Sequence, residues 1–323
     1  MNIIQSFLFL HKNKILKVYH NIKEVTLTNK TVVTLGTFDG VHKGHQAILK
    51  RLVAISQKEN LESLVLTFFP HPRKIVSNQD EIKLLNTIHE RTALLEKNEI
   101  DHFVIHPFDV EFANLSPLEF VEQVLVKQFN VRKIIIGHDH KFGKNRAANF
   151  HDLIDFGKQF GFEVEEISAQ VVDEVSVSST KIRNALFEGN VALANEFLGY
   201  QYTIQGTVEK GNQLGRTINF PTANLAINED YKLIPKIGVY AVEIYYKNQK
   251  YFGMMNIGMR PTINGVNKTI EVHVFDFNKN IYGEKLTIEF VKKIREEQKF
   301  ESFEQLKEQL ERDKKTTINL FRN

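Results

Sequence analysis

Short apolar runs alternate with stretches of helical spacing through the first half of the chain. The runs are rich in Val, Ile, Leu and Phe, which is typical of buried strands. They lie at 32–35, 64–69, 102–105, 131–136 and 163–167, and the helical patterns between them cover 46–59, 90–98, 117–128 and 151–160. Strands separated by helices predict parallel βαβ units, and hence an α/β domain with a Rossmann-like, doubly wound parallel sheet. Ligands of such sheets bind beyond the carboxyl ends of the strands.

The second half has a different period. A helical connector is predicted over 186–198, with a break at Gly189-Asn190. Strand-like alternation then follows at 202–209, 219–225, 238–246, 250–257, 269–277 and 285–292. Short turns between these runs predict a small six-stranded antiparallel β-barrel. A terminal helix is expected from Ser302, with Gln305 completing a capping box and Phe303, Leu306 and Leu310 forming its apolar face.

Length and composition agree with two globular domains. The chain has 323 residues, of which 42% are hydrophobic and 25% charged, so two ordinary cores are possible. We expect an extension at 1–17, a first domain at 18–187 and a second at 188–323. The net charge of +3 permits phosphorylated ligands without indicating nucleic acid. The absence of cysteine excludes disulfides, thiolate metal sites and cysteine nucleophiles.

No apolar run approaches the roughly 20 residues that span a bilayer. The apolar segment 3–10 has no basic region before it and no small-residue cleavage site after it. We therefore expect a cytoplasmic protein that does not bind membranes.

The segment Gly36–His45 carries the strongest chemical signal. It connects the strand at 32–35 to a helix start, an arrangement that points backbone N–H groups at an anion. His42 and His45 are three residues apart and share a face where the helix begins. Gly44 removes a side chain where a phosphate approaches closely. Two ordinary surface histidines are the alternative, but strand, glycines, spacing and helix start all agree with a phosphate site.

Three more segments of the first half are chemically suggestive. The loop 137–144 crowds polar groups after the strand at 131–136, and the proline-flanked His71 follows the strand at 64–69, although His71 also fits a stiff turn. In Ser178-Ser179-Thr180 the hydroxyls suit a helix N-cap. Arg183 lies three residues beyond Thr180 on the same helical face, where a guanidinium suits a phosphate.

These segments resemble bacterial FAD synthetases, members of the nucleotidyltransferase superfamily that carries a HxGH motif. Gly36–His45 resembles the first signature, 137–143 the Gly-x-Asp/Asn-x-x-Phe-Gly loop, and 178–183 the Ser-Ser-Thr-x-Ile-Arg signature. The resemblance implies catalytic roles in adenylyl transfer for His42, His45 and Arg183. It also implies nucleotide contacts from Gly36, Phe38, Asp39, Gly44, Asp139, Ser179 and Thr180.

The barrel half contains a second motif, which runs from Gly211 to Asn224 and ends in Pro-Thr-Ala-Asn. On an extended strand Thr222 and Asn224 point to the same side. A hydroxyl and an amide oxygen suit Mg²⁺, which prefers oxygen ligands. Thr and Asn at a strand end are often only solvent-facing, but the Gly-rich lead-in favours a site. No P-loop is present, so a kinase here belongs to another class.

The barrel half resembles riboflavin kinases. The resemblance implies that Thr222 and Asn224 hold Mg²⁺, that Gly215, Arg216, Arg260 and Arg295 contact ATP or flavin, and that Glu271 is the catalytic base. A salt bridge at the barrel rim is the alternative for Glu271, and a solvated charge run for Arg295. Asn219 departs from the family pattern, which has Gly before Phe-Pro-Thr.

Together the two resemblances, over roughly 18–320, imply a bifunctional riboflavin kinase and FAD synthetase. The implied co-substrate is ATP with Mg²⁺; riboflavin, FMN and FAD are substrate or product. We expect small-molecule substrates, no nucleic acid partner, and a monomer or weak homo-oligomer. Two rivals are a nucleotidyltransferase for another phosphorylated substrate with a non-catalytic barrel, and a protein that binds nucleotides or RNA without catalysis. The barrel lacks the dense basic patch with interleaved aromatics expected of the latter.

Overall fold

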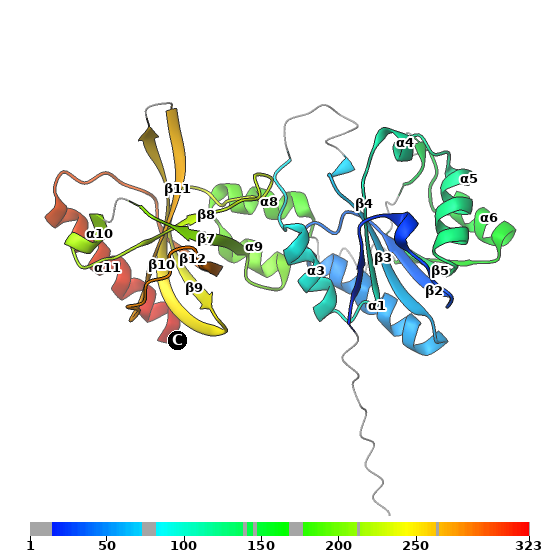
Figure 1. Ribbon diagram of the computed structural model, residues 1–323, viewed down its shortest axis with the longest axis horizontal. Coiled ribbons are helices and arrows are strands. Elements are labelled where there is room, and N and C mark those ends of the chain that lie inside the picture. Colours follow the sequence, from blue (N-terminus) through cyan, green and yellow to red (C-terminus); the bar gives the residue numbers. More distant parts are fainter. Residues whose placement is uncertain are drawn as a thin grey trace, which may run out of the picture. The chain divides into compact units, whose positions relative to one another are not determined.

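The computed structural model describes residues 15–72, 82–137, 141–144, 147–167, 177–211, 214–262 and 265–322, with the backbone alone at 214, 216, 260–262 and 265–267. Its described residues form two compact units, which are treated separately below (Figure 1). The first unit comes from Met1–Ile82 and Ile88–Ser176, and the second from Lys83–Thr87 and Val177–Asn323.

The first unit is built on a parallel sheet with the order β1-β4-β3-β2-β5-β6. Every pair of neighbouring strands in it runs parallel. The strands are β1 Lys17–Tyr19, β2 Thr31–Leu35, β3 Glu62–Phe68, β4 His102–His106, β5 Val131–Gly137 and β6 Glu163–Ile167. The predicted doubly wound fold is therefore confirmed. The strand β1 begins at Lys17, the last residue of the expected extension. Sequence periodicity did not reveal it because it has only three residues.

Helices cover both faces of this sheet, because successive residues of a buried strand point to opposite faces. Val33 and Leu64 pack with Phe120 and Val121 in one core, whereas Val32 and Val65 pack with Leu49 in the other. The helical elements are η1 Ile22–Glu24, α1 Lys43–Glu59, α3 Ile88–Lys97, α4 Val110–Ala113, α5 Pro117–Glu119, η2 Phe120–Gln128 and α6 Phe150–Phe160. A capping box of Ser116 and Glu119 begins the helical stretch that was expected at 117–128.

The strand order reverses direction between β2 and β5. From β2 the chain builds outward to β3 and β4, and β5 then returns to the other side of β2 before β6 is added. Open α/β sheets bind ligands at such a switch point, beyond the carboxyl ends of the strands. The turn after β2 begins at this place in the fold.

The second unit contains a closed antiparallel barrel with the order β10-β11-β8-β7-β12-β9. Its strands are β7 Thr203–Glu209, β8 Ala223–Ala226, β9 Gly238–Tyr246, β10 Gln249–Thr262, β11 Gly265–Val274 and β12 Lys285–Arg295. The helices are α8 Ser179–Glu188, α9 Val191–Leu198, α10 Leu214–Thr217 and α11 Phe303–Arg322. The predicted six-stranded barrel with a terminal helix is confirmed.

The apolar face of α11 differs from the expected one. Phe303 is 57% exposed, whereas Leu310 and Ile318 pack against the barrel residues Phe220 and Met254. The expectation for Phe303 was wrong because the residue lies in the first turn of the helix, before its packed face begins.

The segment 83–87 joins the second unit although it precedes most of the first in sequence. The backbone of Leu84 accepts from Leu233 N–H at 2.8 Å and donates to Tyr231 O at 2.6 Å. The buried Lys232 donates from Nζ to Leu85 O at 2.7 Å. No local sequence signal indicates this insertion.

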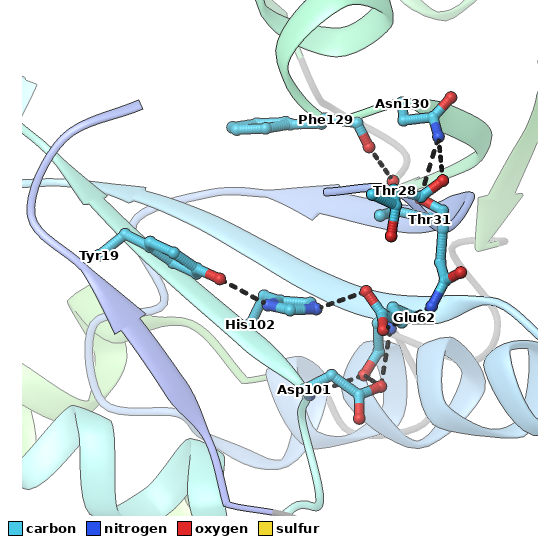
Figure 2. Close-up of polar contacts among 10 residues, drawn as sticks. Tyr19, Thr28, Thr31, Glu62, Asp101, His102, Phe129 and Asn130 are labelled. Atoms are coloured by element: carbon cyan, nitrogen blue, oxygen red, sulfur yellow. Dashed lines mark hydrogen bonds and ion pairs between the residues drawn. The ribbon is translucent and has the colours of Figure 1, made fainter. Parts of the chain in front are cut away.

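Hydrogen bonds through the buried His102 link the short edge strand β1 to β4 and β3 (Figure 2). The Nε2 of His102 lies 2.9 Å from Glu62 Oε2, and its Nδ1 lies 3.2 Å from Tyr19 Oη. The matching roles are Nε2–H donation to the carboxylate and Nδ1 acceptance from the phenol. Burial lowers the pKa of His102, more than the Glu62 carboxylate raises it.

The buried His102 and its two hydrogen bonds predict a pH dependence of stability. The unfolded histidine titrates near its ordinary pKa of about 6.5, and the folded one below that value, so the unfolded state binds more protons as pH falls. Stability is therefore present above about pH 6.5 and is lost as pH drops below it. We expect His102→Gln, which keeps a donor at the Nε2 position, to flatten this loss between about pH 7 and 5 in urea denaturation followed by circular dichroism. His151→Gln on the exposed surface is the control; an unchanged slope in His102→Gln would contradict the assignment.

Candidate active sites

The turn after β2 has a strained backbone. Phe38, Gly40 and Val41 have φ values of +46°, +89° and +35°. A positive φ is ordinary for glycine but rare for a β-branched residue such as Val, and it persists only where the surroundings impose it. Phe38 and Val41 are both buried in the core beneath α1. This burial holds the turn in place and so fixes where α1 begins.

A buried ion pair lies within this turn. Asp39 is 0% exposed and its Oδ1 lies 3.5 Å from Nη2 of Arg91, which is 1% exposed. Nη1 of Arg91 also donates to Thr67 Oγ1 at 3.4 Å, and Thr67 donates to Thr37 O at 3.1 Å. Burying either charge alone is costly, so the pair aims the Asp39 side chain inward.

Arg91 was missed by the sequence analysis. It lies on α3 four residues before the buried Leu95. The one feature of the sequence that could have indicated its burial was an arginine on the apolar face of a predicted helix. The carboxylate of Asp39, predicted to contact nucleotide, is paired with this arginine.

His42 and His45 lie together at the start of α1. His42 is the N-cap, and its Nδ1 accepts from the backbone N–H of His45 at 3.4 Å. The two rings are stacked, with centroids 3.7 Å apart, and the Phe38 ring lies 4.9 Å from that of His45. Gly44 between them is buried. The spacing that predicted a shared face is confirmed.

The environment keeps His45 neutral. Burial lowers the pKa of His45 well below its ordinary value, and the neighbouring His42 and Arg91 lower it further. Among the described residues, Nδ1 of His45 is buried without a hydrogen-bond partner. A neutral imidazole carries one N–H donor, and at a helix N-terminus it adds to backbone donors that favour anions.

The predicted Ser-Ser-Thr segment begins α8 in the second unit. Ser178 is the N-cap and its Oγ accepts from Lys181 N–H at 3.3 Å. Ser179 and Thr180 form the first turn of the helix. Arg183 is largely buried, and its Nε donates to Lys83 O at 3.0 Å. This arginine therefore contacts the inserted segment 83–87.

The loop after β5 is described in part, and Asp139 lies outside the described residues. Phe142 is buried and pairs through its backbone with Ala148. Gly143 has φ +73°, and a Cβ there would lie 2.7 Å from Cγ of Pro117. The Phe-Gly part of the predicted loop is thus explained by close packing against α5.

Aromatic side chains gather where β3 and β4 end, a feature that sequence reasoning missed. The ring of Phe68 lies 5.3 Å from that of Phe108 and 5.2 Å from that of Phe112, and the His106 ring lies 4.7 Å from Phe112. All four are partly exposed. They form an aromatic cluster at the carboxyl edge of the sheet, with the rings tilted or edge-on to one another.

In the barrel, the predicted base and metal-binding residues lie together. Glu271 on β11 is the register partner of Asn224 on β8. Thr222, just before β8, donates from Oγ1 to Glu271 Oε2 at 3.2 Å. All three are partly exposed. A carboxylate, a hydroxyl and an amide thus share one site that solvent reaches.

Close packing explains the glycines before this site. A Cβ on Gly215 would lie 2.1 Å from Phe220 O, and one on Gly211 would lie 2.0 Å from Asn224 Nδ2. Asn219 has φ +63°, a conformation that Asn tolerates better than other non-glycine residues. Asn219 can therefore adopt the backbone conformation that glycine would have at this position of the family pattern. The side chains of Arg216 and Arg260 lie outside the described residues.

Arg295 joins β12 to the terminal helix. Its Nε donates to both carboxylate oxygens of Asp313, at 3.1 and 2.9 Å, and its Nη2 lies 2.8 Å from Oδ2. Asp313 is buried and also accepts from Gln309 Nε2 at 2.9 Å. In the structure Arg295 thus anchors α11, a contact that the charge run around it did not predict.

A strained turn with paired histidines on a doubly wound sheet, and a Thr–Asn–Glu site on a small barrel, define a two-domain protein suited to handling phosphates. The FAD synthetase family model matches residues 24–181, and the riboflavin kinase family model matches residues 198–321. Within the described ranges, no helix is long and apolar enough to cross a membrane.

Relatives cover almost the whole chain. A bifunctional riboflavin kinase/FMN adenylyltransferase of Haemophilus influenzae is 40% identical over 309 residues, covering 95% of this chain and 99% of the relative. One of Listeria monocytogenes is 39% identical over 312 residues, covering 95% and 98%. The crystal structure of a macrolide-efflux protein from Streptococcus pneumoniae matches with a TM-score of 0.85 and 33% identity, covering 94% of this chain and 99% of that one. The chain belongs to the family of bifunctional riboflavin kinase/FMN adenylyltransferases.

The left-handed backbone at Asn219 yields a prediction. Asn219→Gly should fold and phosphorylate riboflavin about as well as the native chain, because glycine adopts this φ freely. Asn219→Val should slow phosphorylation several-fold, because a β-branched residue strains the segment before Thr222 by about 1–3 kcal/mol. Initial rates of FMN formation and melting curves check this. Equal rates for the two variants would contradict the conformational explanation.

Proposed function

We propose that this chain makes FAD from riboflavin in two steps. The barrel transfers the ATP γ-phosphate to the riboflavin 5′-hydroxyl, and the sheet domain joins the resulting FMN to AMP from a second ATP, releasing pyrophosphate. The proposed division between the activities is 18–187 and 188–323. The contact between Thr222 and Glu271 opposite Asn224 carries the kinase half of this proposal. Family membership makes another phosphorylated substrate the weaker alternative.

In the kinase step, Glu271 accepts the proton of the riboflavin hydroxyl as the oxygen attacks the γ-phosphorus. The bond from that phosphorus to the bridging oxygen breaks, and ADP leaves. Strand pairing fixes Glu271 against Asn224, which supports a preorganised site. Gly211 and Gly215, on the segment just before this site, have no side chain and so let the backbone pack closely against Asn224 and Phe220.

Mg²⁺ fits this site through its oxygen donors. The described residues contain no group of three or more His, Cys, Asp or Glu side chains able to hold a metal ion. A cation at the barrel would be held by Thr222 and Asn224 oxygens, with ATP phosphates and water completing its shell. When bound, it would neutralise phosphate charge during transfer.

In the adenylyl step, the FMN phosphate attacks the α-phosphorus of ATP and pyrophosphate leaves. Negative charge then grows on the non-bridging oxygens, which fixed donors stabilise. We assign this role to His42, His45 and Arg183, with Ser179, Thr180 and the backbone at Gly36 and Gly44 holding phosphates. Phe38, Asp39 and Asp139 complete the proposed nucleotide contacts; in the structure the Asp39 carboxylate is paired with Arg91.

We assign the aromatic cluster at Phe68, Phe108 and Phe112 to the flavin ring in the adenylyl step. It lies at the carboxyl ends of β3 and β4, the edge at which such sheets bind ligands. The three rings are partly exposed, their centroids lie 5.2–5.9 Å from one another, and they offer apolar surface to a planar heterocycle.

Glu271→Gln tests the kinase assignment. Loss of the base should slow FMN formation from riboflavin by about 10²- to 10⁴-fold, while FAD formation from supplied FMN continues. Asp276→Asn is a matched control, since Asp276 is exposed beyond the end of β11 and Asn tolerates its φ of +52°. Product analysis by chromatography gives both rates. Near-normal phosphorylation by Glu271→Gln would place the base elsewhere.

His45→Ala tests the adenylyl assignment. Removing a donor to the α-phosphate should slow FAD formation from FMN by about 10²-fold, with riboflavin phosphorylation nearly unchanged in the same preparation. His89→Ala, on the exposed side of α3, is the control. A folded His45→Ala protein that lost both activities would rule out two separate sites.

A further inference from the structure

The strand ladder beside the kinase site stops one residue short of Thr222. The pairing between β8 and β11 consists of Asn224 with Glu271 and Ala223 with Val272. Pro221 and Thr222 lie beyond this ladder, and proline has no N–H with which to extend it. Something other than backbone pairing must therefore fix the position of Thr222.

His273 makes the next contact along β11. Its Nδ1 lies 2.7 Å from Pro221 O. A carbonyl oxygen only accepts, so Nδ1 carries the hydrogen and donates it. The backbone pairing between β11 and β8 ends at Val272. The side chain of His273 then makes the next contact between these two segments.

The ring of His273 is held firmly. It is 7% exposed, and its centroid lies 5.1 Å from the Phe220 ring and 5.6 Å from the Phe275 ring. Burial lowers its pKa, which Lys314 on α11 lowers further, while the Pro221 carbonyl raises it. The histidine is therefore neutral at pH 7, with a fixed ring and a single N–H.

We propose that His273 is a positioning residue for riboflavin phosphorylation: its Nδ1–H···O bond to Pro221 holds Thr222 in reach of Glu271 and of the phosphates. This inference rests on the proposed kinase function. Residues 271 and 273 are two apart on one strand, so they project from the same face. A single strand then carries both the base and the group that fixes the Mg²⁺-binding segment against it.

Two amide variants separate the hydrogen bond from the packing. The Nδ2 of Asn takes the place of the imidazole Nδ1, whereas the amide of Gln reaches the place of Nε2. His273→Asn should therefore keep the donor to Pro221, and His273→Gln should lose it. Both variants remain polar, and both lose the ring contacts with Phe220 and Phe275.

The measurement is steady-state riboflavin phosphorylation by the full chain at varied ATP and Mg²⁺. We expect His273→Gln to lower kcat/KM for ATP about tenfold, as loss of one positioned hydrogen bond would, and to need more Mg²⁺ for half-maximal rate. His273→Asn should stay within about threefold of the native chain. FAD formation from supplied FMN should be unchanged in both.

Three results would overturn the inference: native kinetics in His273→Gln, an equal loss in both variants, or an Nε2–H tautomer in the ¹⁵N spectrum of the native protein. The last needs no variant to fold. A native chain that makes no FMN would instead reject the proposed kinase function, so the two failures are distinguishable.

Discussion

An ion pair with almost no exposed surface, between Asp39 and Arg91, is the constraint on which the first site depends. Two buried charges tolerate little displacement, because parting them leaves each uncompensated at a cost of about 3–5 kcal/mol. The pair draws the side chain of Asp39 inward, and the backbone on either side must then turn through positive φ at Phe38, Gly40 and Val41. The chain leaves this turn in the direction that makes His42 the N-cap of α1.

The second site is held in a different way. Its residues lie on neighbouring barrel strands, where register rather than strain fixes their separation. Strand pairing places Glu271 against Asn224, and a hydrogen bond adds Thr222 to them. The barrel is closed, so no free edge allows β8 to slip against β11. The residues of the first site are thus positioned by a strained turn, and those of the second by strand pairing.

Local patterns predicted most elements of the fold, because most expected strands and helices carry their own hydrophobic period and several helices carry their own caps. Val32–Leu35 is buried throughout since helices cover both faces of its sheet, and Gly161 ends α6 in the left-handed conformation. The motifs at 36–45 and 222–224 were recognisable because glycines and polar side chains crowd short segments. These features depend on residues that are neighbours in sequence.

What the sequence did not reveal depends on distant partners. From the sequence alone Arg91 is an ordinary helix residue, because its partner Asp39 lies 52 positions away along the chain. His273 reads as one position of an alternating strand until the Pro221 carbonyl is placed against its ring. Arg295 lies in a charge run and nothing nearby identifies Asp313 as its partner. Such pairings need the fold first, because sequence spacing does not encode contacts between separate elements.

The insertion of 83–87 into the second unit has a consequence for how the chain is assembled. The polypeptide passes between the units at 82/83, at 87/88 and again at 176/177. Each unit is therefore built from two separate stretches of the chain. A single cut at 176/177 would leave the first piece still holding a strand-like peptide that belongs to the second, bonded through Leu84 to Tyr231 and Leu233. Recombination at one point in the gene would therefore not exchange either unit as a complete module.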